Sequence, residues 1–173
     1  MTTFQLDESI NDGDLASQCN DEGQCTVRRY PERLKGTKDP VMLPMILGTD
    51  MPLLTTDFSI VERNIKSIPT NSSGVIVVRP QTPTPDFTSD DAAQIIRSFK
   101  ERFPDWARTN WAGLYVEINE GEIFVARLES FVEWLRKESY DGKVCETLLF
   151  SDPQFIDKLR ELIATPGLRL IDL

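Results

Sequence analysis

Histidine is absent from this 173-residue chain, and its absence excludes several classes of catalytic site. Ser-His-Asp and Cys-His triads need an imidazole as general base, and most catalytic zinc sites use imidazole ligands. If the chain is an enzyme, its chemistry must be carried by carboxylates, hydroxyls, lysines or arginines.

Cysteine is scarce, and long apolar runs are missing. The cysteines are odd in number and lack zinc-ligand spacing, so we expect reduced thiols rather than a disulfide framework at Cys19, Cys25 and Cys145. No apolar stretch approaches the roughly 20 residues of a membrane-spanning helix. The amino terminus lacks the basic and apolar regions of a signal peptide. A cytoplasmic protein without membrane association is therefore expected.

Basic residues are outnumbered: 19 Lys and Arg stand against 28 Asp and Glu, a formal net charge of −9. This balance argues against a broadly basic surface for nucleic acid. It leaves room for an enzyme whose acidic site is neutralised by divalent cations. The chain is 40% hydrophobic, enough for the core of one domain at this length.

The order of the expected elements predicts an α/β fold with a mainly parallel sheet. The expected strand over 74–79 contains an unbroken β-branched run, Val75-Ile76-Val77-Val78, which is typical of a strand buried on both faces of a parallel sheet. Residues 113–118 and 123–128 flank Asn119-Glu120-Gly121 and predict a β-hairpin. We expect a three-layer α/β/α sandwich with an antiparallel C-terminal hairpin. The other expected strands are 4–6, 25–28 and 52–56, and the expected helices include a short one near 15–19, then 39–47, 59–67 and 88–103.

The pattern changes beyond Glu129. A helix is expected from Phe131, a loop around Gly142, and a final amphipathic helix over 153–163. We therefore expect a domain over 1–128 and a helical C-terminal extension over 129–173 that packs on it.

Three aspartates fall at comparable places in this scheme. Asp7 ends the first strand, Asp57 ends the third, and Asp39 opens the helix between them. Ligand sites collect at the carboxyl ends of parallel strands, so the three side chains meet if the first and third strands are neighbours. Such hard oxygen ligands suit Mg²⁺ or Mn²⁺. A metal held in this way can activate water for hydrolysis of a phosphodiester.

Each aspartate also has a purely structural interpretation. Asp39 stands before a proline, as a helix N-cap does, and Pro44 then has to fall within the first turn. Asp57 can cap the next helix, although Ser59 and Glu62 form a capping-box pattern for the same end. Asp7 lies in an acid-rich segment and can be one charge of a solvated loop.

A basic run precedes Asp39 in this otherwise acidic chain. By default such a run is a solvated loop. Its position also places positive charge at the rim of the expected site, where it can face substrate phosphate. The candidates for phosphate binding are Arg28, Arg29 and Lys38.

The order of these motifs resembles the PIN-like domain, in particular the compact branch of VapC-type toxins of bacterial toxin–antitoxin systems. The resemblance covers about residues 1–128. It is carried by Leu6-Asp7-Glu8 after the first strand, Lys38-Asp39-Pro40 at a helix start, Leu53-Leu54-Thr55-Thr56-Asp57, the glycine-led strand, and the hairpin ending in Val125-Ala126-Arg127-Leu128.

The resemblance implies a Mg²⁺- or Mn²⁺-dependent endoribonuclease that hydrolyses RNA phosphodiester bonds as the toxin of a two-gene pair. It implies that Asp7, Asp39 and Asp57 are catalytic metal ligands and that Glu8 is an accessory ligand. RNA is then the substrate, and a cognate antitoxin protein and a homodimer are candidate partners.

Two alternatives stay open. Members of the branch often carry a further aspartate two residues after the last acid, where this chain has Ser59. The missing acid and the unassigned C-terminal helices favour a catalytically inactive PIN-like module that binds protein. A phosphatase on a similar sheet needs two aspartates two residues apart; Asp7 and Asp57 lack that spacing, whereas Asp12 and Asp14 have it.

Overall fold

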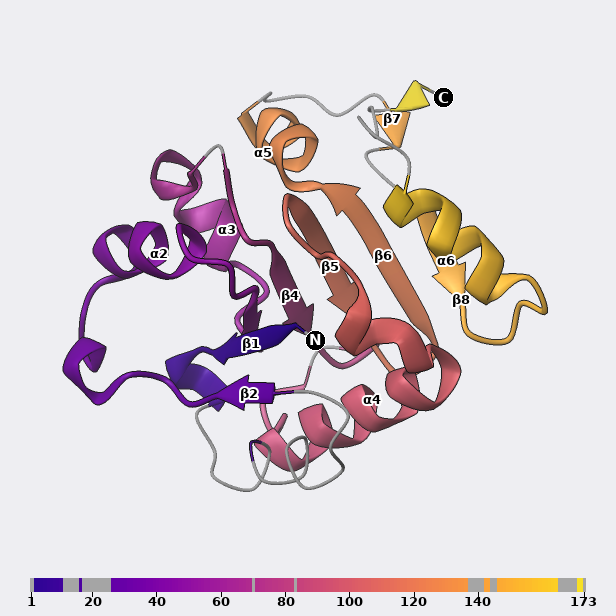
Figure 1. Cartoon of the computed structure of the whole chain (residues 1–173), viewed down its shortest axis with the longest axis horizontal. Coiled ribbons are helices and arrows are strands. Elements are labelled where there is room, and N and C mark those ends of the chain that lie inside the picture. Colours follow the sequence, from indigo (N-terminus) through magenta and orange to yellow (C-terminus); the bar gives the residue numbers. More distant parts are fainter. Residues whose placement is uncertain are drawn as a thin grey trace.

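A computed structural model describes residues 2–10, 16, 26–69, 71–82, 84–136, 142–143, 146–164 and 171–172. Its main feature is a seven-stranded sheet whose first five strands are parallel and whose last two are antiparallel to their neighbours (Figure 1). The order across the sheet is β2 (Thr26–Arg28), β1 (Thr3–Leu6), β3 (Leu53–Thr55), β4 (Val75–Val78), β5 (Leu114–Ile118), β6 (Glu122–Arg127) and β8 (Glu146–Leu149).

Helices cover both faces of the sheet, so the molecule is built as α/β/α layers. Successive residues of β4 point to opposite faces. Ile76 packs in a core cluster with Phe99, and Val77 packs in a second cluster with Leu43. The first cluster is covered by α4 (Ser89–Arg102), the 3₁₀ helix η4 (Pro104–Arg108) and α6 (Phe155–Ala164), and the second by α2 (Asp39–Leu47), α3 (Ile60–Arg63) and α5 (Leu128–Arg136) (Figure 1).

These observations confirm the expected α/β class, the mainly parallel sheet and the hairpin of β5 and β6. The four residues of β4 are buried, as the β-branched run predicts. Gly74 precedes them with φ +106°, and a Cβ there would lie 2.2 Å from the carbonyl oxygen of Trp111. Only glycine accommodates both this backbone conformation and this close approach.

The helix α4 forms as expected. Thr88 is its N-cap and makes a reciprocal capping box with Asp91. The hydrogen bonds from the Thr88 hydroxyl and backbone hold the pKa of Asp91 below its usual value. Phe103 ends the helix before Pro104.

The start of α2 differs from the expectation. Lys38, not Asp39, is the N-cap, and no side chain caps this end. Asp39 is the first helical residue, because the backbone N–H groups of Val41 and Met42 both donate to the Lys38 carbonyl. The helix therefore begins earlier than an N-cap at Asp39 requires, and Pro44 lies in its interior rather than in the first turn.

The helix expected over 59–67 is broken in two, into α3 and the 3₁₀ helix η3 (Ile65–Ser67). The capping box expected from Ser59 and Glu62 does not form. Instead, the backbone N–H and the hydroxyl of Ser59 both donate to Oδ1 of Asp57, at 3.1 and 2.9 Å. Asp57 therefore accepts the hydrogen bonds that shape the entry to α3.

The region beyond residue 128 contributes strands as well as helices. β8 pairs with β6 and was not expected, since Glu146-Thr147-Leu148-Leu149 is too short to give a clear alternation. A two-stranded sheet joins β7 (Gly142–Lys143) to β9 (Ile171–Asp172). The domain boundary expected between residues 128 and 129 stays a prediction.

Two further 3₁₀ helices lie in the first part of the chain, η1 (Glu8–Ile10) and η2 (Glu32–Leu34).

Some sequence-based expectations lie outside the described residues. They concern the side chains of Cys19, Cys25 and Cys145, the pair Asp12 and Asp14, and most of the short helix near 15–19, of which Ala16 alone is described and is helical. Among the described helices, none has the length and apolar character of a membrane-spanning segment.

Candidate functional site

The expected acids lie where the chain order across the sheet reverses. β1 is flanked by β2 on one side and by β3 on the other, and all three are parallel. In such sheets ligands bind outside the carboxyl ends of the strands at this switch point. Asp7 directly follows β1, and Asp57 lies two residues beyond β3. The Asp7 backbone N–H donates to the Leu54 carbonyl at 2.9 Å, which fixes the two strand ends against each other.

Asp7 is buried, with 6% of its surface exposed. Its Oδ2 accepts hydrogen bonds from the hydroxyls of Ser9, at 2.8 Å, and Thr55, at 2.7 Å. No residue in the described part of the chain donates to its Oδ1. A buried carboxylate is costly unless it is compensated by hydrogen bonds, a counter-charge or a metal. Among the described residues, Asp7 therefore has two donors at Oδ2 and none at Oδ1.

Thr55 connects Asp7 to Asp57. Its hydroxyl is fully buried, donates to Asp7, and accepts the backbone N–H of Asp57 at 3.0 Å. Ser9 extends this network, because its hydroxyl accepts from the hydroxyl of Thr56 at 3.2 Å. The ends of β1 and β3 are thus joined by side-chain hydroxyls as well as by the sheet.

Arg63, at the end of α3, joins Asp57 to Asp39. Its Nη2 donates to Oδ2 of Asp57 and lies 3.8 Å from Oδ2 of Asp39. Because Oδ2 of Asp57 and Oδ2 of Asp39 both contact the same nitrogen, the two carboxylates lie near each other. The Arg63 side chain is 56% exposed, Asp39 37% and Asp57 26%. Ion pairs this exposed typically contribute roughly 0.2–1 kcal/mol each.

Asn64 provides a second contact to Asp39. Its side-chain amide donates to Oδ2 of Asp39 at 3.2 Å and to the Ile60 carbonyl at 2.8 Å. Asn64 is buried and is the C-cap of α3. Asp39 is therefore oriented by the end of α3 rather than by its own helix.

Tyr30 lies close enough to the same acids for their charges to affect its pKa. Its hydroxyl donates to the Leu34 carbonyl at 2.9 Å. Burial raises the pKa of this phenol most, and the charges of Glu8, Asp7 and Asp39 raise it further. Glu8 is exposed and accepts the backbone N–H of Gly36 at 3.4 Å. Glu8 thus lies on the side of the site that faces the loop before α2.

The basic residues expected at the rim are exposed. In the described structure Arg28, Arg29 and Lys38 make no ion pair with the three aspartates. Nη1 of Arg28 lies 4.0 Å from the sulfur of Met51, towards the amino ends of the strands. Among the described residues, the cation that contacts Asp39 and Asp57 is Arg63.

A second polar group lies further along the sheet. The Tyr115 hydroxyl donates to Glu117 at 2.6 Å, and Glu117 forms an ion pair with Arg79 at 2.7 Å. The Tyr115 ring is buried and stacks on Phe131. Burial, followed by the charge of Glu117, raises the pKa of Tyr115 well above its ordinary value.

Sequence reasoning missed four residues that shape the site. Two of them had a weak signal, because Ser9 follows Asp7 by two positions and Thr55 precedes Asp57 by two. A hydroxyl two residues from an aspartate is close enough along the chain to contact that aspartate in a turn. Arg63 and Asn64 had no such signal, since their contacts depend on where the short helix α3 ends.

The donor set suits a hard divalent cation, although it is not preassembled around one. No group of three or more acidic or cysteine side chains among the described residues is arranged to hold a metal. Arg63 contacts both Asp39 and Asp57, while Oδ2 of Asp7 accepts from Ser9 and Thr55. Carboxylate and hydroxyl oxygens are nonetheless the ligands that Mg²⁺ and Mn²⁺ prefer, and a cationic group already lies between two of the acids.

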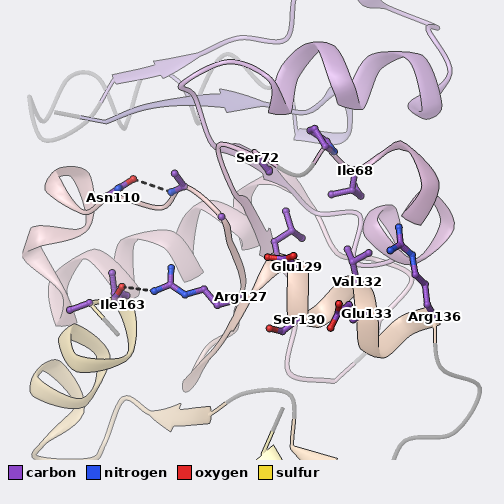
Figure 2. A pocket seen from close by; sticks show the side chains of 15 residues that line it. Ile68, Ser72, Asn110, Arg127, Glu129, Ser130, Val132, Glu133, Arg136 and Ile163 are labelled. Carbon is purple, nitrogen blue, oxygen red and sulfur yellow. Dashed lines mark hydrogen bonds between the residues drawn. The ribbon is translucent and has the colours of Figure 1, made fainter. Parts of the chain in front are cut away.

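Two hollows lie away from these acids, at the amino ends of the parallel strands. One, of about 760 Å³, lies between the segment that precedes β5 and the start of α5. Figure 2 shows Glu129, Glu133 and Arg136 around it, with Arg127 donating to the Ile163 carbonyl. The other, of about 820 Å³, is lined by residues before β3, β4 and β5. The acids lie at the opposite, carboxyl edge, where ligands of parallel sheets bind.

Comparison of the chain with protein-family models, with curated proteins and with solved structures gives no match.

Proposed function

We propose that this chain is a PIN-like, divalent-metal-dependent endoribonuclease whose site is formed by Asp7, Asp39 and Asp57. One observation carries the proposal. Aspartates from three separate segments enter one network of hydrogen bonds and ion pairs at the switch point of a parallel sheet. Scattered caps and loop charges would not be expected to share one such network.

Each side chain has a role in this proposal. Asp7 offers Oδ1, which has no donor among the described residues, as a ligand; Asp39 and Asp57 complete the ligand set, with Glu8 as an accessory. Ser9, Thr55 and Asn64 hold the carboxylates in place. A divalent cation bound there would act as a Lewis acid on the phosphodiester and activate water for its hydrolysis.

The biological setting is a further part of the proposal and is supported by the order of the sequence motifs. The chain would act in the cytoplasm as the toxin of a toxin–antitoxin pair. Its substrate would be RNA, its partner a cognate antitoxin, and its assembly a homodimer.

The test compares three variants that each replace one aspartate by asparagine. Asp7→Asn and Asp57→Asn keep a carbonyl oxygen that can accept from Thr55 or Ser59, so we expect them to fold. We expect each to lower Mn²⁺-dependent cleavage of RNA by at least about a hundredfold, the scale of losing a placed catalytic group. Asp50→Asn is the matched control, since this exposed aspartate precedes β3 at the opposite edge of the sheet. Undiminished cleavage by the Asp7 and Asp57 variants would disprove the proposal.

An inactive protein-binding module is the second candidate. Two of the three aspartates have large exposed hydrophobic residues close by, because Val41 and Met45 follow Asp39 on α2 and Phe58 follows Asp57. Exposed apolar residues grouped near a polar site are typical of protein contacts. In this case Mn²⁺ titration gives no binding to the wild-type chain, and Asp7→Asn changes nothing.

A further inference from the structure

Arg63 forms ion pairs with two of the three aspartates. Its Nη2 contacts Oδ2 of Asp57 and lies 3.8 Å from Oδ2 of Asp39. One nitrogen therefore lies between the two carboxylates. A divalent cation that bridges the same oxygens would need the same space.

The aspartates are also held by contacts that do not involve Arg63. Oδ1 of Asp57 accepts two hydrogen bonds from Ser59, and Oδ2 of Asp39 accepts one from the buried amide of Asn64. None of these contacts involves the guanidinium. Each carboxylate therefore has at least one orienting contact that does not require Arg63.

Arg63 is exposed at the end of a short helix. More than half of its side chain is exposed, and it is the last residue of the one-turn helix α3. Ion pairs of exposed side chains are weak and exchange readily with other ions. A divalent cation carries twice the charge of the guanidinium and competes for the same oxygens.

We propose that Arg63 is the resident counter-ion of the site and that a divalent cation binds there by displacing it. This inference rests on the proposed metal-dependent function. In metal-free protein Arg63 relieves the repulsion between Asp39 and Asp57. Once displaced, its guanidinium is repelled by the bound cation and remains at the rim of the site. There its planar fork suits a phosphate group of the RNA substrate.

The experiment is a calorimetric titration of metal-free protein with Mn²⁺ at constant ionic strength. We expect Arg63→Gln to bind Mn²⁺ about three- to tenfold more tightly than wild type, because a competing cation in an exposed ion pair has been removed. Arg63→Lys keeps the charge but loses the fork, so its affinity should fall between the two. Lys66→Gln is the matched control: it removes the same charge from an exposed residue that makes no ion pair with the acids in the described structure.

Thermal unfolding gives a second readout. Arg63→Gln should lower the unfolding midpoint of metal-free protein, because the two carboxylates then repel each other without a cation. Saturating Mn²⁺ should restore the wild-type midpoint, which would not happen if Arg63 had a structural role alone.

The outcomes separate the two proposals. If wild type binds Mn²⁺ and Arg63→Gln binds it equally well or more weakly, the displacement model is wrong and the metal site stands. A gain in Lys66→Gln as large as in Arg63→Gln also overturns the model, since net charge alone would then explain it. If no variant binds Mn²⁺, the proposed function falls together with this inference. If Arg63→Gln does not fold, Arg63→Lys takes its place: tighter Mn²⁺ binding than wild type supports the model, and equal or weaker binding contradicts it.

Discussion

From the sequence, Asp57 was expected either to cap the next helix or to belong to an acidic site. In the structure it both shapes the entry to that helix and lies among the candidate acids. One of its oxygens accepts hydrogen bonds from Ser59 at the entry to α3, and the other pairs with Arg63. A carboxylate has two oxygens and about four lone pairs, so it can shape a helix entry and face a site at once. A capping role for an aspartate is therefore no argument against a chemical one.

Residue-scale contacts were only partly predictable. The placement of Asp7 and Asp57 follows from strand ends, which the apolar runs of the sequence define well. The ion pair of Arg63 with Asp39 and Asp57 could not be predicted, because it depends on the backbone path after a one-turn helix. Sequence patterns carry periodicity, and α3 is too short to have one.

Tyr115 gives a pH-dependent prediction. Its pKa is raised above the ordinary value of 10.0, first by burial and then by Glu117. The folded state therefore keeps a proton that the unfolded state loses above about pH 10, and stability falls as pH rises beyond that value. Tyr115→Phe should remove this dependence, about 1.4 kcal/mol per pH unit above pH 10.

The measurement is urea unfolding of both proteins between pH 8 and 11. Phe124→Leu is the control, because Phe124 packs edge-on against Tyr115 and does not titrate. It should lower stability by a similar amount at every pH. Parallel pH curves for wild type and Tyr115→Phe would contradict the assignment.

At the scale of elements, periodic segments were predictable and short ones were not. The β-branched run of β4 and the capped apolar stripe of α4 are long and regular, and both form where expected. β8 has four residues and was missed, because its pairing with β6 is decided by the hairpin beside it. The start of α2 shifted by one residue, since the Lys38 carbonyl accepts the first helical hydrogen bonds.

Gly74, at the start of β4, gives a prediction at this scale. Alanine there combines a left-handed backbone with a Cβ 2.2 Å from the Trp111 carbonyl oxygen. We expect Gly74→Ala to lower the free energy of unfolding by more than about 2 kcal/mol, beyond the cost of the backbone conformation alone. Gly113→Ala has positive φ and open space around its Cβ, so it should lower stability by only about 1–2 kcal/mol.

Chemical denaturation of the two variants and of Gly121→Ala checks this order. Gly121 has neither positive φ nor a close neighbour, so its variant should remain near wild type. Equal losses at Gly74 and Gly113 would mean that the carbonyl contact is relieved without cost.

The whole molecule offers a test through metal binding. A ligand that binds only the folded state stabilises it by about 2.7 kcal/mol at a hundred times its Kd. For a chain of this size that corresponds to a rise of about 5–10 °C in the unfolding midpoint. We expect Mn²⁺ to produce this rise in wild type and in Asp50→Asn. Asp7→Asn should show little or none, and a full rise in that variant would place the metal elsewhere.

The layered architecture was predictable as a whole because it depends on the hydrophobic pattern of many residues together. Alternating strands and helices require a covered parallel sheet, whichever side chains occupy it. The order of the strands is a different matter. The position of β1 between β2 and β3 determines which acids meet, and patterns within single segments do not specify it.

The position of β1 between β2 and β3 has a consequence for folding during synthesis. Asp7 and Thr55 are 48 residues apart in the chain and meet only when β1 pairs with β3. Contacts this distant in sequence form late, because a long loop must close first. A ribosome therefore makes Asp7 well before it makes the residues that surround Asp7 in the folded protein. The nascent chain carries no assembled site until synthesis has passed α3.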